Sequence, residues 1–121
     1  MGQNNLTGLW GEMIAARYLR KKKYKIIDHS YKTRYGEIDL IACNKQYIVF
    51  VEIKLRKTAK FAEGREFVDF YKQNRIRNAA GFYFSTLDTE LQPRFDVIEI
   101  YAPDGTATAK PVITHLEDAF E

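Results

Sequence analysis

The spacing of apolar and polar residues in the first half of the chain predicts one helix and three strands. Apolar residues recur at helical spacing from about Thr7 to Lys22. We expect this helix to turn one stripe inward, formed by Leu6, Leu9, Trp10, Met13 and Ile14. Three strand-like stretches follow, at residues 24–33, 37–43 and 47–55. Their short, turn-like connections predict an antiparallel meander.

The third strand and the second half of the chain complete the predicted sheet. Both faces of the third strand are apolar over residues 48–51, which is typical of a central strand covered by helices on two sides. A second helix is predicted from its cap Asp69 to Thr86, with an inward stripe of Ile76, Ala79, Ala80 and Tyr83. Strands at 94–101 and, at an edge, 111–116 give the order α-β-β-β-α-β-β. We therefore expect an α/β fold with a mixed central sheet flanked by helices.

Composition narrows the class of protein. With 45% hydrophobic and 29% charged residues among 121, the chain can bury a core, and intrinsic disorder is not expected. No linker or repeat divides it, so residues 1–121 are expected to form one domain, with flexible ends at about 1–5 and at the last few residues. The longest apolar run is far too short to span a membrane, and no leader opens the chain, so we expect a cytoplasmic protein with no membrane partner. A single cysteine, Cys43, and two histidines argue against a disulfide and against a zinc site.

Charge is distributed unevenly along the chain. Residues 1–86 hold 17 Lys or Arg against 8 Asp or Glu, whereas residues 87–121 hold 2 against 8. A basic body of this kind predicts a polyanionic partner such as nucleic acid, although ordinary solvated charge would give the same count.

Charged residues also stand where the strand pattern calls for apolar ones. The period of two places Glu37, Asp39 and Ile41 on one face of the second strand and Ile38 with Leu40 on the other. In the third strand the same rule places Glu52 and Lys54 side by side on one face. Burial of such groups is costly unless they are paired or bind a cation.

A third acid lies on the predicted first helix, among small residues. Glu12 shares a side of this helix with Gly8 and Ala16, which would let it point at the strands that carry Asp39 and Glu52. Three converging carboxylates favour a hard cation, Mg²⁺ or Mn²⁺, which can activate water for attack on a phosphodiester while Lys54 stabilises the developing charge. The alternative is a structural Glu52–Lys54 pair with Asp39 and Glu12 as solvated edge charges.

These residues carry a resemblance to known families. Asp39 followed by Glu52-Ile53-Lys54 resembles the PD-(D/E)-x-K nuclease motif. More closely, three blocks resemble those of the YraN family of predicted endonucleases: Gly11-Glu12-Met13-Ile14-Ala15, Gly36-Glu37-Ile38-Asp39-Leu40-Ile41-Ala42, and Phe50-Val51-Glu52-Ile53-Lys54-Leu55-Arg56. The segment Arg94-Phe95-Asp96-Val97 continues the resemblance, which extends from about Leu6 to Ile100.

The resemblance implies a restriction-endonuclease-like fold, similar to that of archaeal Holliday-junction resolvases, and a metal-dependent endonuclease acting on DNA. It implies that Asp39, Glu52 and Lys54 are catalytic, and that the metal is held by Glu12, Asp39, Glu52 and the backbone carbonyl of Ile53. Glu37 belongs to the same block and could support the metal shell or pair with Arg34. Candidate phosphate contacts are Arg34, Arg56, Lys57, Lys60, Lys72 and Gln73. Tyr31 and Tyr35 could stack on bases or pack in the sheet.

Three hypotheses of function remain open at this point. The first is a Mg²⁺- or Mn²⁺-dependent endonuclease for branched or structured DNA, and symmetrical cutting of a junction would require a homodimer. The second is a non-catalytic nucleic-acid-binding module that retains the fold. The third is an adaptor whose acidic C-terminal part docks another protein.

Overall fold

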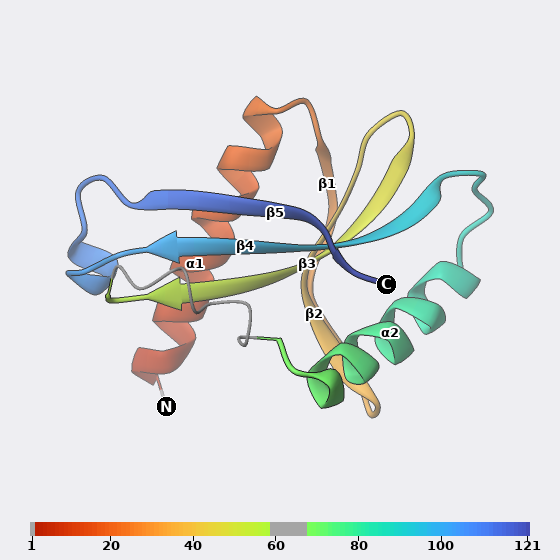
Figure 1. The fold of residues 1–121 in the computed structure, drawn as a ribbon, viewed down its shortest axis with the longest axis horizontal. Helices are drawn as coiled ribbons and strands as arrows, with labels where there is room; N and C mark the ends of the chain where they lie inside the picture. Colours follow the sequence, from red (N-terminus) through yellow and green to blue (C-terminus); the bar gives the residue numbers. More distant parts are fainter. Residues whose placement is uncertain (1, 59–67) are drawn as a thin grey trace.

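The computed structural model describes residues 2–58 and 68–121, with the side chains from residue 7 onward. Two α-helices, α1 (Gly2–Lys21) and α2 (Phe70–Ser85), accompany a five-stranded sheet (Figure 1). The strands are β1 (Lys25–Thr33), β2 (Gly36–Cys43), β3 (Tyr47–Arg56), β4 (Gln92–Tyr101) and β5 (Val112–Phe120), and a short 3-10 helix, η2 (Gly105–Ala107), precedes β5. The predicted order and the mixed α/β class are confirmed, in agreement with a restriction-endonuclease-like fold.

The sheet has the strand order β1-β2-β3-β4-β5. Strands β1, β2 and β3 form the predicted antiparallel meander, β3 and β4 pair in parallel, and β5 returns antiparallel at an edge. The parallel pair requires a crossover between β3 and β4, and α2 lies in that connection. Strand β3 is therefore central, as its two apolar faces predicted.

Each face of the sheet buries its own apolar cluster beneath one helix. Alternate residues of β3 separate the two clusters: Val49 and Val51 pack with α1, whereas Ile48 and Phe50 pack with α2. Helix α2 buries Ile76, Ala79 and Ala80, as predicted, and Tyr83 packs at the margin of that cluster. Asp69 caps α2 by accepting a hydrogen bond from the backbone N–H of Lys72.

The inward face of α1 differs from the prediction. Leu9 and Met13 are both 55% exposed, whereas Ala15, Ala16 and Leu19 are buried against the sheet. Small side chains let the helix backbone approach the strands closely, so the face with the smaller residues is the one that packs. The larger apolar residues Trp10 and Ile14 lie only at the edge of this contact.

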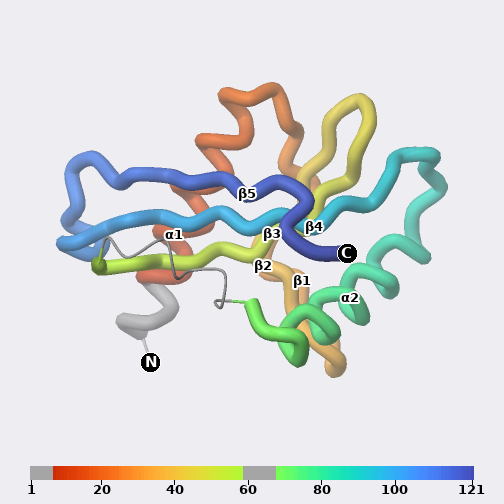
Figure 2. The backbone as a smooth tube through the Cα atoms, viewed as in Figure 1, coloured from red at the N-terminus to blue at the C-terminus, as the bar shows by residue number. Residues whose placement is uncertain are grey.

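The sheet forks at the middle of β2 and β3. Pairing between β2 and β3 extends from Cys43↔Ile48 to Leu40↔Val51. Beyond that point β2 pairs only with β1, as far as Thr33↔Gly36, and β3 pairs only with β4, as far as Arg56↔Tyr101. The β1–β2 hairpin consequently bends away from β3 and lies against α2 (Figures 1 and 2).

The bend disturbs the alternation of side chains in β2. Ile38 packs in the α2 cluster and Leu40 in the α1 cluster, so the prediction that both share one face is wrong. Across from Asp39 in β1, Ser30 has a φ of +49°, a left-handed conformation that a regular strand lacks. Asp39 thus lies opposite a residue of irregular backbone conformation, while the register of the β1–β2 pair shifts nearby, between Ile26 and Asp28. No helix within the described ranges is long and apolar enough to span a membrane.

Candidate functional site

Asp39 lies in the fork between β2 and β3. Its Oδ2 accepts a hydrogen bond of 2.8 Å from the backbone N–H of Ile53, two residues past Val51, where the pairing of β2 with β3 ends. Burial, the negative charge of Glu52 and a side-chain hydrogen bond with Glu52 raise the pKa of Asp39 to about 7, despite the opposing effect of the Ile53 N–H. The negative charge of Glu52 therefore favours the protonated form of Asp39.

Glu52 is the buried member of this pair, at 4% exposure, and two lysines surround it. The Nζ of Lys72 lies 2.6 Å from Glu52 Oε2, and the Nζ of Lys54 lies 3.7 Å from the same atom. Burial and the neighbouring charge of Lys72 lower the pKa of Lys54. At Lys72, burial also acts to lower the pKa, but the hydrogen bond to Glu52 and the charge of Glu52 outweigh it, so that the pKa of Lys72 is raised. The predicted side-by-side arrangement of Glu52 and Lys54 is confirmed.

Glu12 faces the same region from α1 but has different partners. Its Oε2 accepts a hydrogen bond of 2.7 Å from the Ser30 hydroxyl, and its Oε1 lies 3.5 Å from Nδ1 of His29. Glu12 and Asp39 both line a surface hollow, here called the fork hollow, together with Gly8, Leu9, Ser30, Lys32, Glu37 and Ile38. Across residues 2–58 and 68–121, no three His, Cys, Asp or Glu side chains are grouped closely enough to hold a metal ion.

Glu37 links this region to helix α2. It is exposed and lines the fork hollow as well as a second one, here called the α2 hollow, whose other lining residues are Asp69, Tyr71, Lys72, Arg75 and Ile76. The candidate site therefore continues from Asp39 along the surface of α2.

The predicted phosphate contacts occupy different environments. Arg34 is exposed at the β1–β2 turn, and Lys57 is exposed just after β3. Arg56 is half-buried, with Nη2 at 3.6 Å from Oε2 of the buried Glu99. The side-chain amide of Gln73 already has partners within the protein, because it donates a hydrogen bond to the Val68 carbonyl and accepts one from Arg77. Lys60 lies outside the described residues.

The two tyrosines proposed for base stacking, Tyr31 and Tyr35, also lie in different surroundings. Tyr31 packs edge-on against Tyr83, with ring centroids 4.9 Å apart, at the margin of the α2 cluster. Tyr35 is exposed at the β1–β2 turn and stacks on Phe82 of α2. Of these two residues, Tyr35 is exposed and Tyr31 is half-buried.

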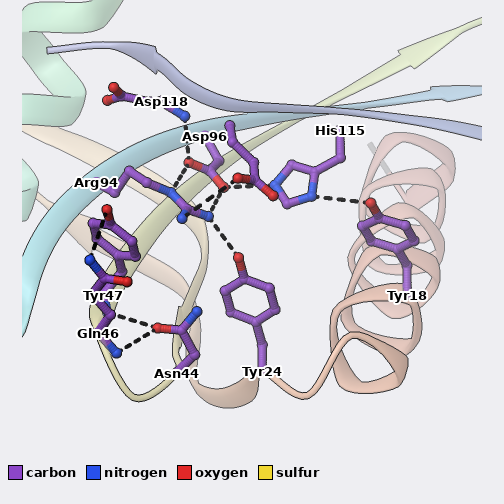
Figure 3. A network of polar contacts seen from close by, with 10 residues as sticks. Tyr18, Tyr24, Asn44, Gln46, Tyr47, Arg94, Asp96, His115 and Asp118 are labelled. Carbon is purple, nitrogen blue, oxygen red and sulfur yellow. Dashed lines mark hydrogen bonds and ion pairs between the residues drawn. The ribbon is translucent and has the colours of Figure 1, made fainter.

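A second polar cluster, which the sequence did not predict, lies between β4 and β5 (Figure 3). The buried carboxylate of Asp96 accepts hydrogen bonds of 2.8 and 2.7 Å from the Arg94 guanidinium and lies 2.7 Å from Nε2 of His115. Tyr24 accepts from Arg94, and Tyr18 contacts Nδ1 of His115 (Figure 3). Burial alone would raise the pKa of Asp96, but these hydrogen bonds outweigh it and lower the pKa.

This cluster fixes β5 to the rest of the sheet. Asp118 has a φ of +53°, which directs its backbone N–H at Asp96 Oδ1, 3.0 Å away. The β4–β5 register shifts at the same place, between Phe95 and Val97. Asp96 is one of the eight acidic residues that make residues 87–121 negatively charged, yet its side chain is fully buried.

The chain is similar to proteins of many bacteria. The model of the uncharacterised protein family UPF0102 matches residues 11–100. A UPF0102 protein of Caldanaerobacter subterraneus is 46% identical over 93% of each chain, and one of Syntrophomonas wolfei is 42% identical over 97% of this chain and 99% of its own length. A UPF0102 protein of Rhodococcus opacus is 40% identical over 99% of this chain and all of its own.

Proposed function

The chain belongs to the uncharacterised protein family UPF0102, and from the site at its sheet fork we propose that it is a metal-dependent endonuclease that hydrolyses DNA phosphodiesters. One observation carries the proposal. Asp39 and Glu52 come from separate strands and meet where β2 leaves β3, with the Lys54 ammonium 3.7 Å from the Glu52 carboxylate. Two acids and a lysine in a fork of the sheet match the PD-(D/E)-x-K motif in type and order.

The donor chemistry at this fork fits Mg²⁺ or Mn²⁺. The two carboxylates repel each other strongly enough to contribute to the raised pKa of Asp39, and a divalent cation would relieve that repulsion. Hard cations prefer oxygen ligands of this kind. The Ile53 carbonyl follows directly in the chain, and Glu12 shares the fork hollow with Asp39. When bound, such an ion supplies a Lewis acid that polarises a phosphoryl oxygen and acidifies a water molecule.

The residues of the chain would do the remaining work. Asp39 is positioned by the Ile53 N–H, and Glu52 by its burial, so neither carboxylate must reorganise. Lys54, whose pKa is lowered by burial and by Lys72, can hold the attacking water or neutralise charge that develops on the phosphate. Exposed Arg34 and Lys57 lie at the ends of the same strands and suit contacts with the DNA backbone.

The test is cleavage of plasmid and branched DNA by the wild type and by Asp39→Asn and Glu52→Gln. Each variant should lose Mg²⁺- or Mn²⁺-dependent cleavage by at least about a hundredfold while retaining its circular dichroism spectrum. Asp88→Asn changes an exposed acid in the loop before β4 and serves as the matched control. Cleavage by Asp39→Asn at the wild-type rate would overturn the proposal.

A second candidate is a nucleic-acid-binding module without catalysis. It is favoured by the position of Lys72, whose ammonium already neutralises Glu52 at 2.6 Å. Under this hypothesis the acids and lysines form a structural ion-pair cluster, and DNA binding persists with no metal binding and no cleavage. Calorimetric titration of Mn²⁺ into the DNA complex separates the two candidates, because only the nuclease requires the ion.

Symmetrical cutting of a DNA junction would add a further requirement. One chain supplies one centre, so a junction resolvase would act as a homodimer with a dyad between two sites. Sedimentation with and without junction DNA tests this form of the proposal, and a monomer bound to the junction would contradict it.

A further inference from the structure

We propose that the outer flank of α2 binds an unpaired DNA strand and leads it into the fork, so that the substrate is DNA with a single-stranded segment beside the cut. The inference rests on the proposed function and specifies its substrate class. It is carried by a row of exposed aromatic side chains with a half-buried arginine among them, none of which belongs to the apolar core.

The row follows one side of α2. Tyr71, Arg75, Asn78 and Phe82 recur at helical spacing and form what is here called the α2 stripe, roughly 16 Å long. Tyr71 is 71% exposed and Phe82 is 49% exposed. Large aromatic rings exposed in a row, away from the buried face of Ile76, Ala79 and Ala80, contribute nothing to the core.

The β1–β2 hairpin adds a second edge to this surface. Tyr35 stacks on Phe82 with ring centroids 5.2 Å apart and planes within 8°. The guanidinium of Arg34 lies over the Tyr35 ring at 5.5 Å, and that of Arg75 lies over the Tyr71 ring at 6.0 Å. Rings that stack bases, next to cations that attract phosphates, are the combination by which proteins hold single strands.

The stripe is continuous with the candidate site. Tyr71 and Arg75 line the α2 hollow with Lys72, whose ammonium reaches Glu52, and Glu37 lines both this hollow and the fork hollow. Glu37 and Asp69 would repel a phosphate but can accept hydrogen bonds from the N–H groups of bases, including the ring N–H of thymine. The α2 hollow therefore suits a base, with the phosphates on its basic rim.

Paired DNA would use this surface poorly. In a duplex the faces of the bases are stacked inside the helix, and exposed rings have no π-face to meet. The stripe should therefore distinguish unpaired from paired DNA, whereas Arg34 and Lys57 would contact the backbone of either.

The test is fluorescence anisotropy in EDTA with labelled oligo(dT) and with a blunt duplex of the same length. The wild type should bind the single strand more tightly than the duplex. Tyr71→Ala and Tyr35→Ala should each weaken single-strand binding about tenfold, with little change for the duplex. Phe70→Ala is the matched control, because Phe70 is the neighbouring residue and is 70% exposed, but lies off the stripe beneath Arg77.

A second measurement keeps this proposal apart from the nuclease itself. Photocrosslinking of oligo(5-iodo-dU) should label Tyr71 or Tyr35 in the wild type and equally in Asp39→Asn, since binding to the stripe needs no metal. Unchanged single-strand binding in Tyr71→Ala and Tyr35→Ala would overturn the proposal that the α2 stripe binds single-stranded DNA, even if Asp39-dependent cleavage is found. Retained crosslinking without any cleavage would support the stripe and overturn only the nuclease.

Discussion

The Asp39 carboxylate hydrogen bonds to the Ile53 backbone N–H at 2.8 Å, just past the last pair of β2 and β3. A side chain of β2 thus maintains contact with β3 after the backbones have parted. The bond also fixes the Asp39 carboxylate beside Glu52. Burial and the negative charge of Glu52 together raise the pKa of Asp39 to about 7. One contact therefore stabilises the fork and creates its unusual electrostatics.

The first prediction concerns pH and stability in EDTA. Because the pKa of Asp39 is raised from 3.8 to about 7, the folded state binds a proton that the unfolded state releases between those values. Stability contributed by this group is therefore present below about pH 4 and lost as the pH rises through 7. Asp39→Asn should remove that loss, so that above pH 7 it is more stable than the wild type by up to about 4 kcal/mol.

Urea denaturation at pH 4.5 and pH 8 checks this difference. The control Asp88→Asn should follow the wild type at both pH values. A constant gap between Asp39→Asn and the wild type across the range would contradict the proton linkage.

The second prediction separates the two lysines at Glu52. Lys54→Ala should lower DNA cleavage about a hundredfold or more with Mn²⁺ affinity no weaker than that of the wild type, because its ammonium acts on the phosphate or water. Lys54→Arg should not restore the rate, since a guanidinium differs in shape and cannot give up a proton. Single-turnover kinetics measures the rate, and Lys45→Ala, in the β2–β3 turn, is the control.

The third prediction concerns competition between Lys72 and a metal ion. The Lys72 ammonium, 2.6 Å from Glu52 Oε2, occupies a position where a cation would also be attracted. Lys72→Met should therefore bind Mn²⁺ more tightly, by roughly tenfold, and be less stable in EDTA by about 1–3 kcal/mol because Glu52 loses its closest partner. Calorimetric titration of Mn²⁺ provides the comparison, and weaker binding in the variant would make Lys72 a support of the metal site instead.

The fourth prediction concerns the contact between the β1–β2 hairpin and α2. A Cβ on Gly36 would come within 2.2 Å of the Arg75 carbonyl oxygen, so Gly36→Ala must displace the hairpin or the helix. We expect a loss of about 2 kcal/mol or more, together with weaker single-strand binding as Tyr35 moves off Phe82. Gly8→Ala is the control: a Cβ there meets nothing within 4 Å, and helix propensity should make it slightly stabilising.

The fifth prediction concerns the buried cluster of β4 and β5. Asp96→Ala leaves the Arg94 guanidinium buried without its main partner and should cost about 3–5 kcal/mol. Because hydrogen bonds lower the pKa of Asp96 in the folded protein, its contribution is present above pH 4 and is lost in acid. Thermal denaturation at pH 7 and pH 3 should therefore show a smaller deficit in acid.

The spacing of apolar and polar residues predicted the helices and strands well, because each helix or strand is determined by residues close together in the chain. Asp69 capped α2 as expected, and the apolar faces of Ile48–Val51 predicted a central strand. The prediction of which face of α1 points inward was wrong, because both faces of this helix carry apolar residues. Periodicity alone does not show that Ala15 and Ala16, and not Leu9, would pack against the sheet. That choice depends on how closely the helix can approach the strands.

The candidate site was predictable only within each strand. The period of two placed Glu52 beside Lys54, since both lie on β3. It did not predict that Lys72, 20 positions later on α2, would lie closer to Glu52, or that His115 would meet Asp96. Those contacts depend on the fork and on the β5 register shift, which no local pattern encodes.

The parallel pairing of β3 with β4 has a consequence for the order of folding. It joins Tyr47 to Gln92, 45 positions apart, whereas the β1–β2–β3 meander joins near neighbours in the chain. Closing so long a loop is slow, so we expect the meander to form first and the β3–β4 pair to limit the folding rate. The Asp39–Ile53 bond needs only the early part, but Lys72 reaches Glu52 once the crossover has closed. The two carboxylates would therefore meet with only Lys54 beside them, before Lys72 arrives, and a divalent cation present during folding could bind them before Lys72 does.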